Sequence, residues 1–328
     1  MLSGNNQNIQ ISIFTPAEPP LSYKDTLKMY KEYMVFRRLM LNIFGILLFG
    51  YINAQNKSAL LVGISEYPQS GQSSWGTIHG SNDVELIMPF LSERGFLIDS
   101  LCNQAATASN IRTAINNIIK TSKLNDIIYL HFSCHGQPFE DMDDDEEDGW
   151  DESIVPYDAQ MIYKKDIYEG QNHITDDELN IYLNKLRAIV GPEGYVLVVF
   201  DACHSGGSSR GDEFSDEEDD IYIRGTNVGF TIHEKDYRPR INAQSNYQIK
   251  TENEYANITI LEACRSYQSN HEIKQDGKYY GPLSYYISQV LAKQIDLCSL
   301  EWILEVKSLM NSDGRLIRQN MVYETSLK

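Results

Sequence analysis

Two stretches of the sequence decide the fold: Asp126-Ile-Ile-Tyr-Leu-His-Phe-Ser-Cys-His-Gly136 and Tyr195-Val-Leu-Val-Val-Phe-Asp-Ala-Cys-His-Ser-Gly206. Each begins with a continuous apolar run rich in β-branched and aromatic residues. Such runs predict strands that are covered on both faces of a parallel sheet. Each run then ends in a cysteine–histidine pair. In open α/β sheets functional sites form at the carboxyl ends of the strands, so we expect the two pairs to meet at one edge.

Apolar patterns on either side of these stretches predict alternating strands and helices. Further strands are expected at residues 57–64, 96–101, 257–263 and 320–325, and helices at 81–93, 107–121, 175–188, 283–293 and 300–310. Alternation of this kind implies parallel pairing through helical crossovers. The fold class is therefore α/β, with a mostly parallel central sheet of about six strands.

Two polar segments interrupt the pattern. Residues 140–151 are dominated by Asp and Glu, and residues 206–254 mix acidic and basic side chains throughout. Segments of this composition bury too little apolar surface to order themselves. We therefore predict a flexible loop at about 206–254, and a loop of that length inside a domain is normally functional or disordered.

The N-terminal region has the three-part layout of a secretory signal peptide. Arg37 and Arg38 precede an apolar run at 39–50, and Ile52 and Ala54 then stand three and one residues before Gln55. We predict a start at Met34, cleavage before Gln55, an N-terminal extension and signal peptide over 1–54, and an exported domain over 55–328. The apolar run is too short for a stable membrane span. The alternative is a buried N-terminal helix.

Charge and cysteine content limit the partners. The formal net charge of −18 argues against nucleic acid, whose binding needs clustered Lys and Arg, and suits cationic substrates or hard cations. The predicted mature chain holds five cysteines, so at least one thiol stays unpaired, and their spacing indicates no disulfide framework.

Three interpretations of the paired Cys and His residues compete. A thiol nucleophile with an imidazole base is the first, with the amides of Gly136 and Cys203 placed to hold an oxyanion. A zinc site is the second, although adjacent Cys-His pairs are poor chelators because neighbours in extended chain point to opposite faces. The third is packing of small, buried cysteines.

Several ordered motifs resemble those of metacaspases and their bacterial relatives. Ser133-Cys-His-Gly136 resembles a family Ser-Gly-His-Gly motif, and Asp201-Ala-Cys-His-Ser-Gly-Gly207 is similar to the family's nucleophile motif. Between them, Asp144-Asp-Glu-Glu-Asp-Gly-Trp-Asp-Glu-Ser-Ile-Val-Pro-Tyr-Asp158 and Ile174-Thr-Asp-Asp-Glu-Leu179 have close counterparts, as do Gly80-Ser-Asn-Asp-Val84 and Ala263-Cys-Arg-Ser266. The resemblance spans about residues 59–290.

The resemblance implies a caspase-like three-layer sandwich and a cysteine endopeptidase. In such an enzyme Cys203 attacks the peptide and His135 supplies acid–base chemistry. The pocket for the residue before the scissile bond, S1, is expected to be lined by Asp83 and Asp201, with Ser133 beside them. Carboxylates there select polypeptide substrates with Arg or Lys at that position. No cofactor is needed for the chemistry, and a monomer is expected.

Calcium activation and self-processing are further implications of the resemblance. Asp151, Asp176 and Asp177 match aspartates that bind calcium in the family, although a further family aspartate after the nucleophile has no counterpart here. The polar loop resembles the family's processing linker, which predicts self-cleavage after Arg210 or Arg224. Cys134 departs from the family, which has Gly at that position, and a disulfide from Cys134 to Cys203 is a further hypothesis.

Three rival interpretations remain at this stage. The first is a non-catalytic caspase-fold module with a regulatory or calcium-binding role, and the second is a zinc-stabilised scaffold. Gingipain-like peptidases, the third, share the His-Gly and Cys layout, but the segment Asp148-Gly-Trp-Asp151 favours the metacaspase side.

Overall fold

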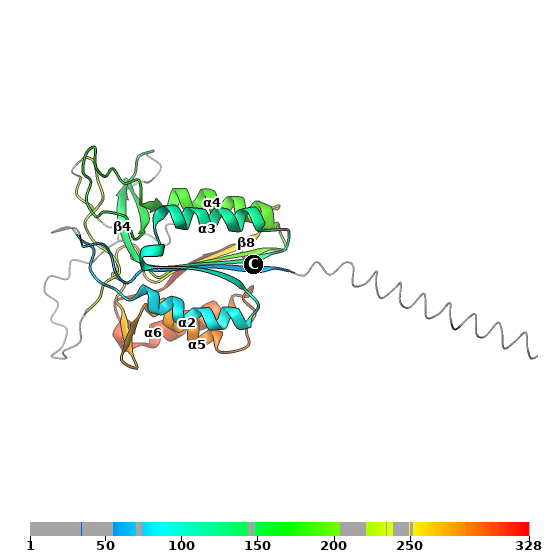
Figure 1. The fold of residues 1–328 in the computed structure, drawn as a ribbon. Coiled ribbons are helices and arrows are strands. Elements are labelled where there is room, and N and C mark those ends of the chain that lie inside the picture. Colours follow the sequence, from blue (N-terminus) through cyan, green and yellow to red (C-terminus); the bar gives the residue numbers. More distant parts are fainter. Residues whose placement is uncertain are drawn as a thin grey trace, which may run out of the picture. The chain divides into compact units, whose positions relative to one another are not determined.

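A six-stranded sheet forms the middle layer of residues 55–328, which make up one compact unit of the computed structural model (Figure 1). The strand order is β11-β8-β7-β3-β1-β2. Neighbouring strands run parallel except at β11, which pairs antiparallel with β8. Their bounds are β1 Lys57–Gly63, β2 Leu97–Cys102, β3 Ile127–Ser133, β7 Tyr195–Phe200, β8 Asn257–Glu262 and β11 Val322–Thr325. The predicted α/β class and six-stranded, mostly parallel sheet are confirmed.

The structure describes only part of the chain: Met34, 55–69, 74–143, 146, 148–203, 221–233, 235–238, 249 and 252–327. Apart from Met34, the predicted signal peptide lies outside these residues, and export therefore stays a prediction. Arg210, one of the two predicted processing sites, also lies outside them. No helix within the described residues is long and apolar enough to span a membrane.

Helices cover both faces of the sheet and complete the three layers (Figure 1). One face carries α3 (Ala108–Thr121) and α4 (Asp176–Val190), and the other carries α2 (Gly80–Glu93), α5 (Pro282–Leu291) and α6 (Glu301–Ser312). Two of these helices start at side-chain caps. The hydroxyl of Thr107 accepts from the amide of Asn110, and that of Thr175 accepts from Glu178.

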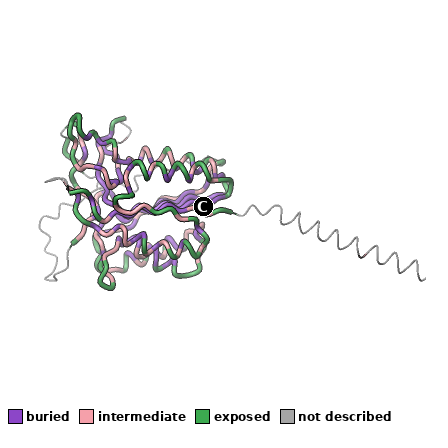
Figure 2. Tube along the Cα trace, viewed as in Figure 1, coloured by how far each residue is buried: buried purple, intermediate pink, exposed green. Residues whose placement is uncertain are grey.

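Two hydrophobic cores lie on the two sides of the sheet, because successive strand residues point to opposite faces. In β3, Ile128, Leu130 and Phe132 enter one core, while Ile127 and Tyr129 enter the other. The four inner strands β1, β3, β7 and β8 are buried almost throughout, the edge strands β2 and β11 are not, and the helices show an exposed outer side (Figure 2).

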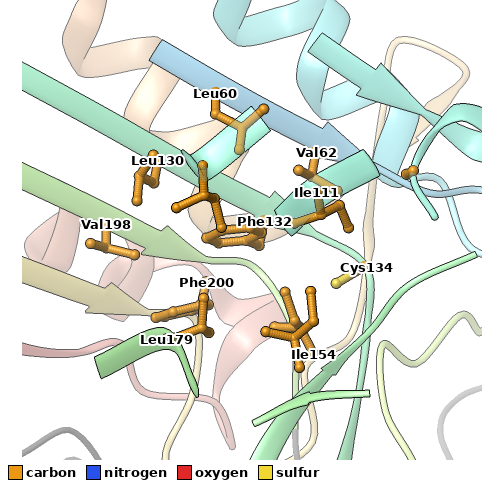
Figure 3. Packing of buried hydrophobic residues seen from close by; sticks show 14 of the residues in the cluster. Leu60, Val62, Ile111, Leu130, Phe132, Cys134, Ile154, Leu179, Val198 and Phe200 are labelled. Atoms are coloured by element: carbon orange, nitrogen blue, oxygen red, sulfur yellow. The ribbon is translucent and has the colours of Figure 1, made fainter. Parts of the chain in front are cut away.

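Cys134 packs in the first core, beside the stacked rings of Phe132 and Phe200, whose centroids are 5.4 Å apart (Figure 3). Burial raises the pKa of this thiol to about 12. The position therefore favours a packing role for Cys134.

A second, antiparallel sheet lies beyond the carboxyl end of the main sheet's strands. It contains β4 (His135–Glu140), β5 (Trp150–Val155) and β6 (Ile174–Thr175). A hairpin of β9 (Ile273–Gln275) and β10 (Lys278–Tyr280) completes the strands. Two single 3₁₀ turns occupy Asn103–Ala105 and Gly314–Leu316. Apart from β4–β6 and the hairpin, each strand and helix matches a segment that the sequence predicts.

Part of the predicted flexible loop at 206–254 is described by the structure, and that part is paired with other segments of the domain. Residues 221–233 lie against the second sheet, where Gly225 pairs with Gly136 and Phe230 pairs with Phe139. The Phe230 ring is buried and stacks on Phe139 with centroids 5.0 Å apart. Unlike the rest of the loop, this segment contains several apolar residues, and the buried Phe230 ring, the backbone pairing to β4 and the buried Arg224 side chain all contact the rest of the domain.

Candidate active site

The ends of β3 and β7 bring the two predicted catalytic residues to one edge of the main sheet. These strands are parallel neighbours in which Phe132 pairs with Phe200, so that His135 and Cys203 both follow the same sheet edge. The amides of Gly136 and Cys203 converge on one acceptor. Both donate to the carbonyl oxygen of Arg224, at 3.2 Å and 2.8 Å respectively. The predicted oxyanion donors therefore already hold a peptide carbonyl.

The His135 ring is buried against aromatic side chains. It stacks on Trp75 with ring centroids 5.1 Å apart, and Tyr67 lies at 5.2 Å. Its Nε2 atom is 2.8 Å from the carbonyl oxygen of Gly76, which can only accept, so Nε2 carries the proton. Its Nδ1 atom is buried and has no hydrogen-bond partner. Burial lowers the pKa of His135 to about 4, which leaves a neutral imidazole with a lone pair at neutral pH.

The Cys203 thiol donates to the carbonyl oxygen of Gln268 at 2.8 Å. A second thiol shares this acceptor, because Cys264 donates to the same oxygen at 3.4 Å. A hydrogen bond with Cys203, together with burial, raises the pKa of Cys264 well above its usual value. The cysteine beside Cys203 is therefore Cys264, which the sequence reasoning did not single out.

The predicted S1 carboxylates form a closed acidic pocket, and the Arg224 side chain fills it. The carboxylate of Asp83 accepts from Arg224 Nη1 at 2.6 Å, and an Asp201 oxygen lies 3.5 Å from the same nitrogen. All three side chains are fully buried. Burial alone would lower the pKa of Arg224, but the surrounding carboxylates raise it, so the guanidinium stays charged.

Glu272 is a third carboxylate in this pocket, and the sequence reasoning missed it. Its Oε1 atom accepts from Arg224 Nε at 2.9 Å and lies 2.8 Å from Nη2. Its Oε2 atom lies 2.6 Å from the Nδ1 of His79. Burial opposes ionisation of Glu272, but the charge of Arg224 and the bonds from His79 outweigh it and lower the pKa. No motif marked this residue, although it lies soon after the matched segment Ala263-Cys-Arg-Ser266.

Fixed donors hold the two predicted S1 carboxylates in place. Asp83 also accepts from the hydroxyl of Ser133 at 2.8 Å, which agrees with the expected position of that residue. Asp201 accepts from the amide and hydroxyl of Ser284, both at 2.7 Å, and from the side-chain amide of Asn270 at 2.8 Å. The pocket is therefore pre-organised, because its carboxylates need not turn to meet a cation.

Gly281 forms part of the wall of the pocket. Its amide donates to Asp83 at 3.0 Å. A Cβ at this position would collide with an Asp201 oxygen and with Nη1 of Arg224. Only glycine leaves room for a guanidinium here.

The three predicted calcium ligands lie in a separate, crowded acidic region. Asp151 and Asp176 are buried. Desolvation and the charges of Asp151, Asp177 and Glu146 raise the pKa of Asp176 well above its usual value, and its Oδ1 atom has no hydrogen-bond partner. Desolvation, with Asp143 and Asp141 nearby, likewise raises the pKa of Asp177.

The chemistry of these residues fits a hard cation, because calcium prefers carboxylate oxygens. The part of the chain that the structure describes nevertheless contains no ready group of three or more His, Cys, Asp or Glu ligands for a metal. Asp144, Asp145 and Glu147 belong to the same acidic segment but lie outside the residues that the structure describes.

A sheet of this order between two helical layers, with Cys and His at its carboxyl edge, defines a caspase-like fold. A solved structure of a protein from Geobacter sulfurreducens shares it: the TM-score is 0.57 and the identity 22%, over 82% of this chain and 93% of that one. At this identity the likeness shows the fold alone.

Sequence comparisons show which family part of the chain resembles. Residues 57–209 match the model described as metacaspase, peptidase C14 domain. Metacaspase-1B of Aspergillus fumigatus is 38% identical over 161 residues, which is 46% of this chain and 35% of the relative. Metacaspase-1 of Botryotinia fuckeliana is 35% identical over 170 residues, 48% of this chain and 36% of the relative. The chain thus spans about a third of the length of these curated relatives. Over somewhat less than half of its length, the chain is therefore similar to metacaspases and to their peptidase C14 domain.

Proposed function

We propose that this chain is a cysteine endopeptidase in which Cys203 is the nucleophile and His135 the acid–base group. The Cys203 sulfur attacks the substrate carbonyl carbon, and the thiol proton passes to His135 Nδ1. The amides of Gly136 and Cys203 bind the oxyanion that develops. His135 then protonates the leaving amine, and water hydrolyses the thioester to release a carboxylate and restore the thiol. The neutral, buried imidazole supports this role.

The substrate residue before the scissile bond is proposed to be basic, with Arg preferred over Lys. The observation that carries this proposal is the Arg224 side chain inside the acidic pocket, with its own carbonyl oxygen on the two amides. A guanidinium presents several donors in a fixed fork, so it meets Asp83 and Glu272 at once. A lysine ammonium at the same depth would contact fewer of these carboxylates.

Self-processing is proposed at the bond between Arg224 and Gly225. Arg224 is bound as a substrate residue would be, and a Cβ at Gly225 would collide with the Cys203 carbonyl oxygen. A glycine after the scissile bond therefore permits the close approach. Until this bond is cut, the Arg224 side chain fills the pocket and blocks the binding of other substrates. The intact chain is therefore expected to be an inactive precursor.

Calcium is proposed as an activator held by Asp151, Asp176 and Asp177. The observation in favour is the crowding of buried carboxylates, whose mutual repulsion a divalent cation would relieve. In this role the ion would stabilise the structure, because no step of the peptide hydrolysis is assigned to it. A non-catalytic calcium-binding module is the second candidate function, supported by the same carboxylates.

One peptide assay tests the function. Purified full-length protein is incubated with fluorogenic peptides ending in Arg, Lys or Asp, with and without calcium, beside a Cys203→Ala variant. We expect the Arg peptide to be cleaved fastest, the Lys peptide more slowly, and no turnover from the variant. Absence of turnover in every condition would favour the non-catalytic module, and a preference for Asp would overturn the assignment of the pocket.

A further inference from the structure

Residues 222–224 lie along residues 270–272 as an added antiparallel strand. The Arg224 amide donates to the Asn270 carbonyl at 3.0 Å, and the Glu272 amide donates to the Tyr222 carbonyl at 3.0 Å. Ile223 forms the antiparallel bridge with His271 between them. Backbone pairing of this kind supplies affinity, while alternate side chains supply specificity. Side chains two residues apart in a strand share a face, so Tyr222 lies on the same side as Arg224.

The Tyr222 ring lies in an aromatic site. Its centroid is 4.6 Å from the His79 ring, edge to face, and 4.8 Å from the Tyr279 ring. His79 and Tyr279 stack on each other with centroids 5.0 Å apart and planes inclined by 24°. These separations and angles are those at which aromatic rings attract one another beyond simple area burial.

His79 is held rigidly in this site by the acidic pocket. Its ring nitrogen and its backbone amide bind the two carboxylate oxygens of Glu272, at 2.6 Å and 2.7 Å. Glu272 in turn binds the Arg224 guanidinium. Glu272 therefore holds the His79 ring of the aromatic site in place and also binds the basic side chain of Arg224.

We infer that His79 and Tyr279 form an S3 subsite for an aromatic side chain, the third residue before the scissile bond. The inference rests on the proposed function and narrows its substrates to segments of the form aromatic–X–Arg. The flanking positions are permissive. Ile223 is only partly buried, and Ile221 is largely exposed. In the intact chain Tyr222 occupies this subsite, and a substrate's aromatic side chain takes its place after self-cleavage.

The test compares three fluorogenic peptides on the self-cleaved full chain: acetyl-Tyr-Ile-Arg, acetyl-Leu-Ile-Arg and acetyl-Ala-Ile-Arg. The Tyr peptide is expected to have a kcat/KM about threefold to tenfold above the Ala peptide, the range of one aromatic pair, with the Leu peptide in between. In Tyr279→Leu this advantage is expected to shrink below about twofold, because the ring that the substrate meets is gone. Tyr280→Leu is the matched control: its ring lies near Tyr285, and the preference should remain.

The outcomes separate the subsite from the function. Equal cleavage of the Tyr and Ala peptides would overturn the S3 assignment and leave the peptidase intact. A Leu peptide as good as the Tyr peptide would make the subsite apolar rather than aromatic, and a full preference in Tyr279→Leu would place it elsewhere. Both results contradict the inference. If none of the three Arg peptides is cleaved, the proposed function fails and the inference fails with it.

Discussion

The carbonyl oxygen of Arg224 accepts a hydrogen bond from the amide of Cys203 at 2.8 Å. The same residue sends its guanidinium into a pocket of three buried carboxylates. A single residue of the chain thus occupies both the oxyanion position and the specificity pocket of the proposed enzyme. In the proposed function, the intact chain therefore holds its own first substrate in place.

Enlarging Gly281 should close the pocket. In Gly281→Ala the new Cβ collides with an Asp201 oxygen and with the Arg224 guanidinium. Overpacking of this kind costs about 1–3 kcal/mol, so cleavage of Arg peptides and self-cleavage should both fall by roughly fivefold to a hundredfold. The release of fluorophore would measure the rate of peptide cleavage, and gel electrophoresis would measure the rate of self-cleavage. Gly314→Ala is the control, because a Cβ there meets open space; an unaffected Gly281→Ala would contradict the pocket's shape.

Removing the charge of Glu272 should weaken the choice of Arg over Lys. Glu272→Gln loses a charge-assisted contact to the guanidinium, worth about 1.5–3 kcal/mol, or roughly tenfold to a hundredfold in kcat/KM for Arg peptides. Lys peptides, which we expect to rely on Asp83, should lose less. The ratio of the two kcat/KM values is the measurement, with the exposed Glu93→Gln as control. Equal losses for both peptides would show that Glu272 does not distinguish them.

Self-cleavage should weaken as the pH falls through about 7. Burial raises the pKa of Asp83 to about 7, and only its ionised form attracts the Arg224 guanidinium. Titration of His135 does not cause this fall in rate, because burial lowers its pKa to about 4 and the imidazole stays neutral above that pH. Rates of self-cleavage across a pH series would reveal the step. A rate of self-cleavage that does not change from neutral pH down towards pH 4 would contradict this role of Asp83. The Asp83→Asn variant should cleave itself slowly at every pH, because it has no carboxyl group to titrate.

Calcium should raise the melting temperature of the wild-type protein more than that of Asp176→Asn. Without calcium the variant should be at least as stable, because burial and neighbouring carboxylates already raise the pKa of Asp176 and oppose its ionisation. The measurement is thermal unfolding at matched calcium concentrations. The exposed Asp99→Asn should respond like the wild type. Equal calcium shifts in all three proteins would exclude Asp176 as a ligand.

The sequence predicted the main sheet well because its strands are continuous apolar runs. Residues 195–200 were predicted to be a strand, and β7 has those bounds. Strands β4–β6 were missed because their composition opposes the pattern. β4 contains Pro138 and ends at Glu140, and β5 contains Asp151 and Glu152. These strands owe their form to pairing with one another, which no local apolar period reveals.

Some residues of the candidate site were likewise indicated by the sequence, and others were not. Ordered motifs indicated Asp83, Ser133, His135, Asp201 and Cys203. The structure places Asp83 and Asp201 beside the Arg224 guanidinium and Ser133 beside Asp83. The roles assigned to the five residues stay predictions. Cys203 contributes its amide to the Arg224 carbonyl. The ordered position of Arg224 was not foreseen, because it lies within a long stretch rich in charged residues and its partner Asp83 is 141 positions away. A buried ion pair between such distant residues leaves no mark on local composition.

The most direct test of the account is the mass of the fragments that the purified wild-type chain produces on incubation, beside Cys203→Ala and Arg224→Gln. We expect a single early cut between Arg224 and Gly225 in the wild type, and intact chain in both variants over the same period. A first cut elsewhere, or cleavage of Cys203→Ala at the wild-type rate, would contradict the claim that Arg224 lies in the active site as the first substrate.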